Sequence, residues 1–284
     1  MIAIERLRYV RLGTRDLATS VNFAQQVLGL ELASHTDRIA YFRSDSRDPS
    51  LTFTTDVQGH AVALELRDIE SLDAAAKVLI EAGYVVERGT ADQCAERKVK
   101  AFIAINNQSG PQIELVVRPL TSGWRYFPSR DAGVTGLAAV ALRSSRPEID
   151  LRLWTKLFDG TISDRVGDAA YIGFDEVHHR VAVHPAEQPS ILAVEFAVES
   201  LDQLMQNWYF RGNSQVIKIA HGPGRRPTSD QLFVTFHGPD DVLYSFVAEG
   251  SQIADRHAHR SRQFVKAPLS FCCWGSESQI VEFG

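Results

Sequence analysis

The chain repeats itself, and this repeat limits the folds that it can adopt. The stretch ESLDAA at 70–75 returns as ESLDQL at 199–204, and PQIELVV at 111–117 returns as DVLYSFV at 241–247. Both pairs lie about 130 residues apart, and in each half a strand-like segment and an amphipathic helix precede a run of strands. The sequence therefore predicts an internal duplication.

The first half combines strand and helix signals. Residues 7–14 alternate in hydropathy as a half-buried strand does, and Asp16 then precedes a helical spacing of apolar residues that stops at Gly29. A second helix is predicted over 71–82, from a Ser cap to Gly83. Further strands are predicted at residues 39–43, 50–54, 60–65, 100–105 and 112–118.

The second half restarts the same pattern after a turn-rich stretch. Its predicted helices cover 148–158 and 200–210. Its predicted strands cover residues 137–142, 169–174, 178–184, 191–198, 231–237 and 242–247. One βαβββ unit leaves a sheet face uncovered, and a second unit closes it. We therefore expect an α+β fold of two tandem modules, each a pair of βαβββ units, with strands wrapped around a cleft.

The expected boundaries follow from the turn-rich stretch and from the end of the repeat. They are an N-terminal module at 1–120, a linker at 121–135, a C-terminal module with a cup-shaped site at 136–250, and a tail at 251–284. In the tail, the basic stretch 255–260 is interpreted as a solvated loop.

Composition excludes several classes of partner. A net charge of −5 argues against nucleic acid as an obligate partner, because phosphate binding needs a basic face. We expect no membrane insertion, because no apolar run approaches the roughly 18 residues that a membrane span needs. Three cysteines without CxxC spacing indicate a reduced, cytoplasmic protein.

Several stretches together resemble type I extradiol dioxygenases, which belong to the vicinal oxygen chelate (glyoxalase/bleomycin resistance) superfamily. The first half resembles their non-catalytic module through LRYVRLGTRDLATSVNFAQQVLGLEL and GPQIELVVRP, and the second resembles their catalytic module through TGLAAVAL, FDEVHHRVAV, VEFAVESLDQL and FVTFHGPDDVLYSF. The resemblance covers nearly the whole chain. It implies the tandem vicinal oxygen chelate fold, oxidoreductase chemistry in aromatic compound degradation, and a homo-oligomer.

The same resemblance points to a degenerate metal site. In that family two histidines and a glutamate hold Fe(II) or Mn(II), with open positions for a catecholate and dioxygen. The corresponding positions here are Ala139, Ala193 and Ser245. A methyl group has no lone pair and a neutral hydroxyl is a poor ligand, so we expect no cofactor. Fe(II) or Mn(II) would bind only at a displaced site.

One acid/base candidate of that family remains. The motif HHTLA survives as HHRVA, and the resemblance implies an acid/base role for His179. Glu195 shares a strand face with Ala193, and His237 shares one with Thr235. We therefore expect His179, Glu195 and His237 to converge in the cup as catalytic groups.

Other residues are expected to bind the substrate or to support the site. Tyr171, Arg226 and Thr235 are expected to contact the substrate. The resemblance places Arg226 where the family has a histidine and Thr235 where it has a substrate-facing tyrosine, and the Gly-rich stretch 221–226 is interpreted as a mobile loop over the cleft. A buried Glu195 needs a partner such as Arg226, Arg143 or a histidine. His184 lies five positions after His179, and this odd offset predicts that the two point to opposite faces.

Three functions stay open from sequence. The preferred one is a family member that lacks the usual metal ligands and binds a small aromatic or phenolic compound, with or without metal-free acid/base chemistry. The second is a non-catalytic ligand-binding protein or partner subunit of an active dioxygenase. The third is a genuine Fe(II)-dependent catechol dioxygenase with a displaced metal site.

Overall fold

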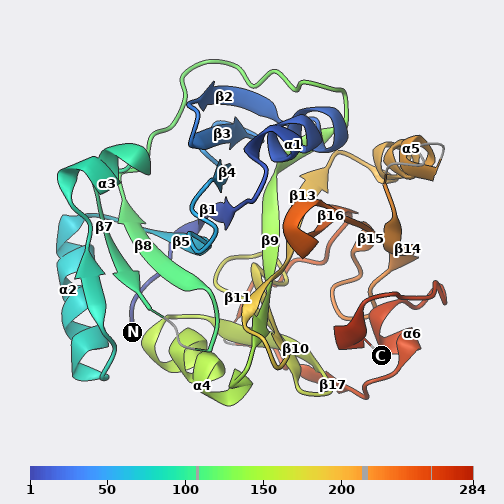
Figure 1. Cartoon of the computed structure of the whole chain (residues 1–284). Helices are drawn as coiled ribbons and strands as arrows, with labels where there is room; N and C mark the ends of the chain where they lie inside the picture. The colour runs from blue at the N-terminus through green and yellow to red at the C-terminus, as the bar shows by residue number, and fades with distance from the viewer. Residues whose placement is uncertain (107–108, 213–216, 257, 284) are drawn as a thin grey trace.

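The computed structural model describes residues 1–106, 109–212, 217–256 and 258–283, which form two mixed β-sheets with few helices (Figure 1). The first sheet has the strand order β2-β3-β4-β1-β5-β8-β7-β6. Its strands are β1 (Arg6–Gly13), β2 (Glu31–His35), β3 (Ile39–Arg43), β4 (Leu51–Thr54), β5 (Ala61–Leu66), β6 (Val86–Arg88), β7 (Ala101–Ile105) and β8 (Gln112–Val117).

The second sheet has the order β14-β15-β16-β13-β9-β12-β11-β10-β17. Its strands are β9 (Val134–Ser144), β10 (Thr161–Val166), β11 (Ala169–Gly173), β12 (Val181–Pro185), β13 (Ser190–Val198), β14 (Ile219–Arg225), β15 (Leu232–His237), β16 (Leu243–Ala248) and β17 (Arg262–Phe264). Without β17 and read in the reverse direction, this order is β10-β11-β12-β9-β13-β16-β15-β14. It repeats the order of the first sheet, with every strand number raised by eight. The internal duplication is therefore confirmed, with β17 added beside β10.

Helix starts follow local capping. Asp16 accepts a hydrogen bond from the Thr19 amide at the start of α1 (Leu17–Asn22), which continues as a π-helical segment (Phe23–Leu28). Helix α2 (Ile69–Glu81) is capped by Asp68 rather than by the predicted Ser71, whose amide donates to Asp68 at 2.8 Å. The remaining helices are α3 (Ala91–Glu96), α4 (Pro147–Arg152) with a π-helical segment (Leu153–Leu157), α5 (Leu201–Gly212), α6 (Pro268–Phe271) and the 3-10 turns Pro239–Asp241 and Val281–Phe283.

The structure adds elements that the sequence did not predict. Strands β2, β6 and β17 lie toward sheet edges and are largely exposed, so they lack the apolar alternation that marks a strand. The predicted loop 221–226 is also wrong, because all but its last residue belongs to β14. This strand tolerates Pro223, which has no amide donor, because it lies at the edge of its sheet.

Side chains of the second sheet alternate between two environments. On β12, Val181 and Val183 face the main core, which runs through both modules, while Ala182 faces a smaller cluster on the other side. Across the modules, the Phe23 ring lies 4.8 Å from that of Tyr244. The two sheets therefore share one apolar core, and the second sheet keeps a separate face for a site.

Two expectations from composition can be compared with the structure. No helix in the described part of the chain is long and apolar enough to span a bilayer. Cys94, Cys272 and Cys273 are free thiols.

Candidate functional site

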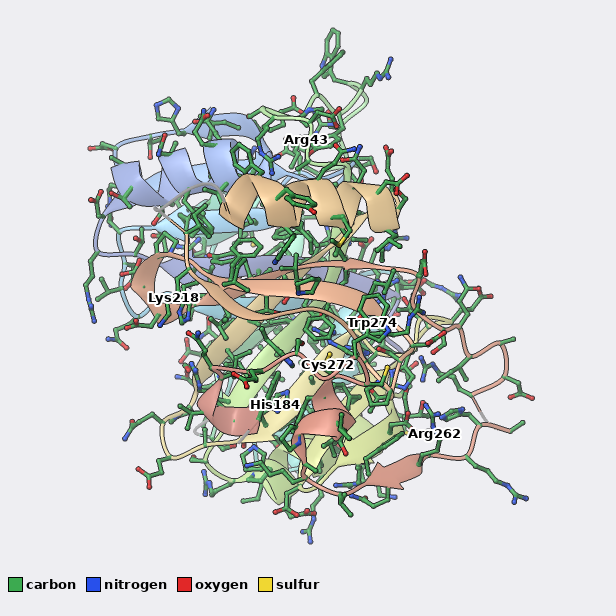
Figure 2. The ribbon with its side chains drawn as sticks, turned by 90° about the vertical axis from the view of Figure 1, so that its right-hand side faces the viewer. Arg43, His184, Lys218, Arg262, Cys272 and Trp274 are labelled. Carbon is green, nitrogen blue, oxygen red and sulfur yellow. The ribbon has the colours of Figure 1, made fainter. Side chains whose placement is uncertain are left out.

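A small cavity of about 30 Å³ opens on the second face of the β9–β17 sheet, and we call it the cup. Residues of β9, β11, β13, β15 and β16 line it, and so do residues near α6. Figure 2 views the molecule from the side of α6 and labels His184, which also lines the cup. Five of the six predicted catalytic and substrate-binding residues line it: Tyr171, His179, Glu195, Arg226 and Thr235.

Strand register explains why these residues meet. Glu195 on β13 pairs with Ala139 on β9 and with Ser245 on β16, and Ser245 pairs with Thr235 on β15. Ala193, two residues before Glu195, faces the same side and also lines the cup. The Thr235 and Ser245 hydroxyls are 2.8 Å apart and hydrogen-bonded to each other. Methyl groups and a paired hydroxyl therefore occupy this row beside a single carboxylate.

The strongest polar contact in the cup is a buried ion pair. Arg226 donates from Nη2 to Glu195 Oε1 at 2.6 Å and from Nη1 to Oε2 at 3.0 Å. The Glu195 side chain is only 6% exposed. Burial alone would lower the pKa of Arg226, but the Glu195 carboxylate outweighs it and raises that pKa. The predicted need of Glu195 for a charged partner is confirmed, and Arg226 fills it.

His179 lies beside this pair without joining it. Its Nε2 is 4.0 Å from Glu195 Oε2, beyond hydrogen-bond distance. Its Nδ1 is 3.1 Å from Nδ1 of His178, and the Tyr171 ring meets the imidazole edge-on with centroids 5.0 Å apart. Burial, helped by the nearby His178 and Arg226, holds the pKa of His179 well below its ordinary value, so the ring is neutral at pH 7.

The predicted position of His184 is wrong, because His184 and His179 both line the cup. Strand alternation does not connect the two, since His179 lies in the bend before β12 and only His184 lies within that strand. Burial lowers the pKa of His184 to about 4, and its Nδ1 is buried without a hydrogen-bond partner among the described residues. The cup therefore contains two neutral histidines rather than one.

The expected convergence of His237 with His179 and Glu195 is not found. His237 ends β15 and lines a neighbouring cavity of about 660 Å³ together with Arg143 and Lys266. It shares a strand face with Thr235 as predicted. However, it lies two residues closer to the end of β15, where its side chain is exposed. Arg143, another suggested partner of Glu195, is paired with Glu282 instead.

Sequence reasoning missed the segment that covers the cup. Phe271 on α6 and Phe283 stack with ring centroids 4.4 Å apart and planes 6° apart, and both line the cavity with Ile280. Their apolar side chains, widely spaced in a polar tail, were the available signal. The predicted solvated loop 255–260 is also ordered in part, because Arg256 donates to the backbone carbonyls of Asp175 and Val177. His257 of that stretch lies outside the described residues.

The first module holds a comparable buried pair. Glu114, third in β8, is equivalent to Ser245, third in β16. It is fully buried, accepts from the Tyr9 hydroxyl at 2.5 Å and pairs with Arg97 at 2.7 Å. Glu114 and Arg97 thus form a buried ion pair comparable to that of Glu195 and Arg226.

The fold can now be compared with known proteins. Residues 6–115 match the model of the Glyoxalase/Bleomycin resistance protein/Dioxygenase superfamily. An iron-dependent extradiol dioxygenase from Rhodococcus jostii (strain RHA1) is 24% identical over 286 residues, which cover 89% of this chain and 92% of that protein.

Solved structures extend the likeness over the whole chain. That of BphC, a halotolerant catechol dioxygenase, gives a TM-score of 0.87 at 18% identity and covers 100% of this chain and 98% of its own. The Mn(II)-bound glyoxalase from Novosphingobium aromaticivorans gives 0.88 at 20% identity, with 99% and 94% covered. The chain therefore has the tandem vicinal oxygen chelate fold of extradiol dioxygenases. A dioxygenase and a glyoxalase share it, so the fold alone selects no reaction.

The side chains around the cup do not fit the metal site that this fold family implies. Such a site needs two histidines and a free carboxylate on one side of the metal, with open positions on the other. Within the described ranges, no three His, Cys, Asp or Glu side chains lie close enough together to hold a metal ion. The cup's carboxylate, Glu195, directs both oxygens at Arg226.

Breaking the ion pair tests its importance for the fold. We expect Arg226→Met to lower the free energy of unfolding by about 3–5 kcal/mol, because it leaves the Glu195 carboxylate buried and unpaired. The double variant with Glu195→Leu should recover most of this loss. Urea unfolding of both variants measures the effect.

The matched control is the neighbouring Arg225, whose pair with Glu249 is more exposed. Arg225→Met should cost less than about 1 kcal/mol. If Arg226→Met costs no more than this control, the buried pair does not organise the cup.

Proposed function

We propose that this protein binds a small phenolic compound in the cup, without the Fe(II) or Mn(II) of its fold family. The observation that carries the proposal is the mixed lining of the cup, which combines His179, His184 and Tyr171 with apolar residues such as Leu243 and Phe271. Among the described residues, His184 Nδ1 has no hydrogen-bond partner, and His179 Nε2 is 4.0 Å from Glu195 Oε2, beyond hydrogen-bond distance.

Hydrogen bonding favours a hydroxyl group beside these imidazoles. Buried polar atoms in folded proteins are almost always satisfied, so an unpaired imidazole nitrogen favours a ligand or water that can donate. Burial raises the pKa of Tyr171 to about 12, so its hydroxyl keeps its proton and can donate in turn. A phenol matches the imidazoles and Tyr171 because its hydroxyl both donates and accepts.

The size of the cup adds a condition. A volume of about 30 Å³ accommodates roughly two water molecules, whereas cavities known to bind benzene are on the order of 150 Å³. The stacked rings of Phe271 and Phe283 fill the space next to His184, with the Phe283 ring 5.4 Å from the imidazole. In this proposal the ring of the ligand replaces one of these aromatic side chains.

Calorimetric titration tests the proposed binding. We expect catechol to bind and toluene, which has no hydroxyl, to bind at least about tenfold more weakly. His179→Phe should weaken catechol binding about fivefold, because one hydrogen bond to a neutral acceptor is worth roughly 1 kcal/mol. The control is His35→Phe, at an exposed position on β2. Equal catechol affinity in wild type and His179→Phe would contradict the proposal.

Opening the cup should strengthen binding. Phe283→Ala removes half of a stacked pair worth roughly 0.5–1.5 kcal/mol, so we expect catechol to bind about two- to tenfold more tightly. The control is Leu269→Ala, which changes an exposed residue of the same segment. An unchanged or weaker affinity in Phe283→Ala would show that the ligand does not take the place of this ring.

A further inference from the structure

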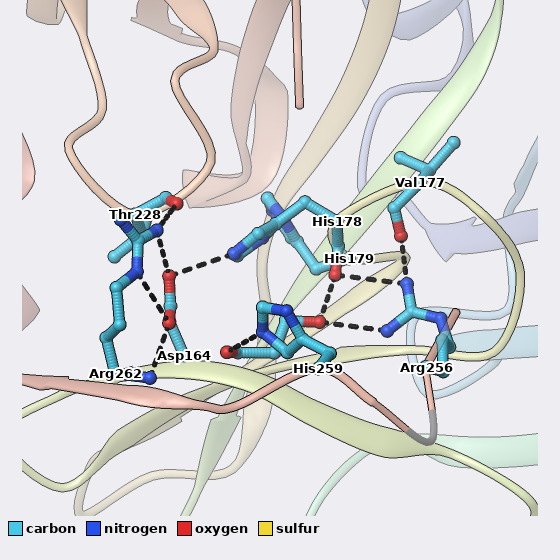
Figure 3. Close-up of polar contacts among 9 residues, drawn as sticks. Asp164, Val177, His178, His179, Thr228, Arg256, His259 and Arg262 are labelled. Atoms are coloured by element: carbon cyan, nitrogen blue, oxygen red, sulfur yellow. Dashed lines mark hydrogen bonds and ion pairs between the residues drawn. The ribbon is translucent and has the colours of Figure 1, made fainter. Parts of the chain in front are cut away.

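We propose that Asp164 and His178 are positioning residues, which hold His179 in the one tautomer that presents a bare Nε2 to the cup. The inference rests on the proposed function for its purpose, because a bare Nε2 is what a phenolic hydroxyl needs. The geometry that carries it is a chain of contacts from β10 to the cup (Figure 3).

The series of hydrogen bonds begins at the carboxylate of Asp164, which can only accept hydrogen bonds. Asp164 on β10 is fully buried, and Arg262 on β17 binds both of its oxygens. Burial alone would raise the pKa of Asp164, but hydrogen bonds from His178 and Arg262 lower it below its ordinary value. Asp164 is therefore ionised at pH 7, and each of its neighbours must act as a donor.

The ionised Asp164 carboxylate determines which nitrogen carries the proton, first in His178 and then in His179. His178 Nε2 lies 3.1 Å from Asp164 Oδ2 and so must carry a proton. Burial lowers the pKa of His178, so the ring is neutral and its Nδ1 keeps a lone pair. His179 Nδ1, at 3.1 Å from that lone pair, must then be the donor. Since His179 is neutral as well, its Nε2 has no proton.

This tautomer of His179 explains why its Nε2 forms no hydrogen bond with Glu195. His179 Nε2 and Glu195 Oε2 are both acceptors in this assignment, and they stay 4.0 Å apart instead of forming a hydrogen bond. Glu195 turns to Arg226 for its donors. The bare nitrogen is thus left for a donor from outside the protein, which is the role that the phenolic hydroxyl has in the proposed function.

The backbone around the two histidines is fixed from the same side. Ser163 and Arg256 both donate to the carbonyl oxygen of His178, and Arg256 also donates to that of Val177. His259 lies close by, but its Nε2 contacts the carbonyl oxygen of Ser163 at 2.8 Å rather than Asp164, His178 or His179. His259 is therefore a nearby histidine outside the chain of contacts, which makes it a suitable control.

Nitrogen NMR of the imidazole rings in the intact, ligand-free protein tests the assignment. We expect His179 to show a protonated Nδ1 and an unprotonated Nε2 at pH 7. In Asp164→Asn, we expect the amide oxygen to keep the two Arg262 contacts made at Oδ1, while the amide NH₂ gives up the contact with Arg262 Nη2 and donates to His178 Nε2. This reverses both rings, and we expect His179 to carry its proton on Nε2. His259→Gln should leave the His179 signals unchanged.

A proton on Nε2 of His179 in the wild type would overturn the proposal, even if the Asp164→Asn variant does not fold. An unchanged His179 tautomer in folded Asp164→Asn would overturn it as well. Catechol affinity gives the second readout, with an expected loss of about fivefold in Asp164→Asn, as for His179→Phe. If catechol fails to bind the wild type while the NMR assignment holds, the proposed function is wrong and the positioning role stands.

Discussion

The ion pair between Arg226 and Glu195 is the interaction on which the character of the cup depends. A carboxylate buried on the middle strands of a sheet destabilises the fold unless a charged donor meets both of its oxygens, and Arg226 does so in a bidentate geometry. Both oxygens of Glu195 are thus bound to a guanidinium, which repels a metal cation. The cup is consequently lined by neutral histidines and apolar side chains, and not by a cluster of anionic ligands.

The duplicated fold explains how such a site can change while its scaffold stays. The two sheets repeat the same strand order, and their helix-covered faces share one continuous core. The residues that face the cup lie on the other side of the same strands, so they contribute little to that core. In the first module the equivalent face holds Glu114 with Arg97 and Tyr9. Both modules keep a neutralised carboxylate, but only the second keeps paired histidines beside it.

Much of the fold could be predicted from sequence because apolar alternation and capping residues mark the central strands and the helices. Edge strands such as β2 and β17 could not, since their exposed residues carry no such alternation. The convergence of Tyr171, His179, Glu195, Arg226 and Thr235 followed from strand faces and from the resemblance to extradiol dioxygenases. His184 and His237 were misplaced because the alternation of side chains between two faces holds only within a regular strand and does not say how far along the strand a site extends. His179 precedes β12, so alternation does not relate it to His184, and His237 lies beyond the rim of the cup. The contact of Phe271 with Phe283 joins segments that no local pattern connects.

Metal analysis is the most direct test of this account. The protein would be purified, equilibrated with Fe(II) or Mn(II) without oxygen, passed through a desalting column and measured for metal by elemental analysis. The account predicts far less than one metal ion per chain in the wild type. One ion per chain in the wild type, lost when His179 and His184 are replaced together, would contradict it.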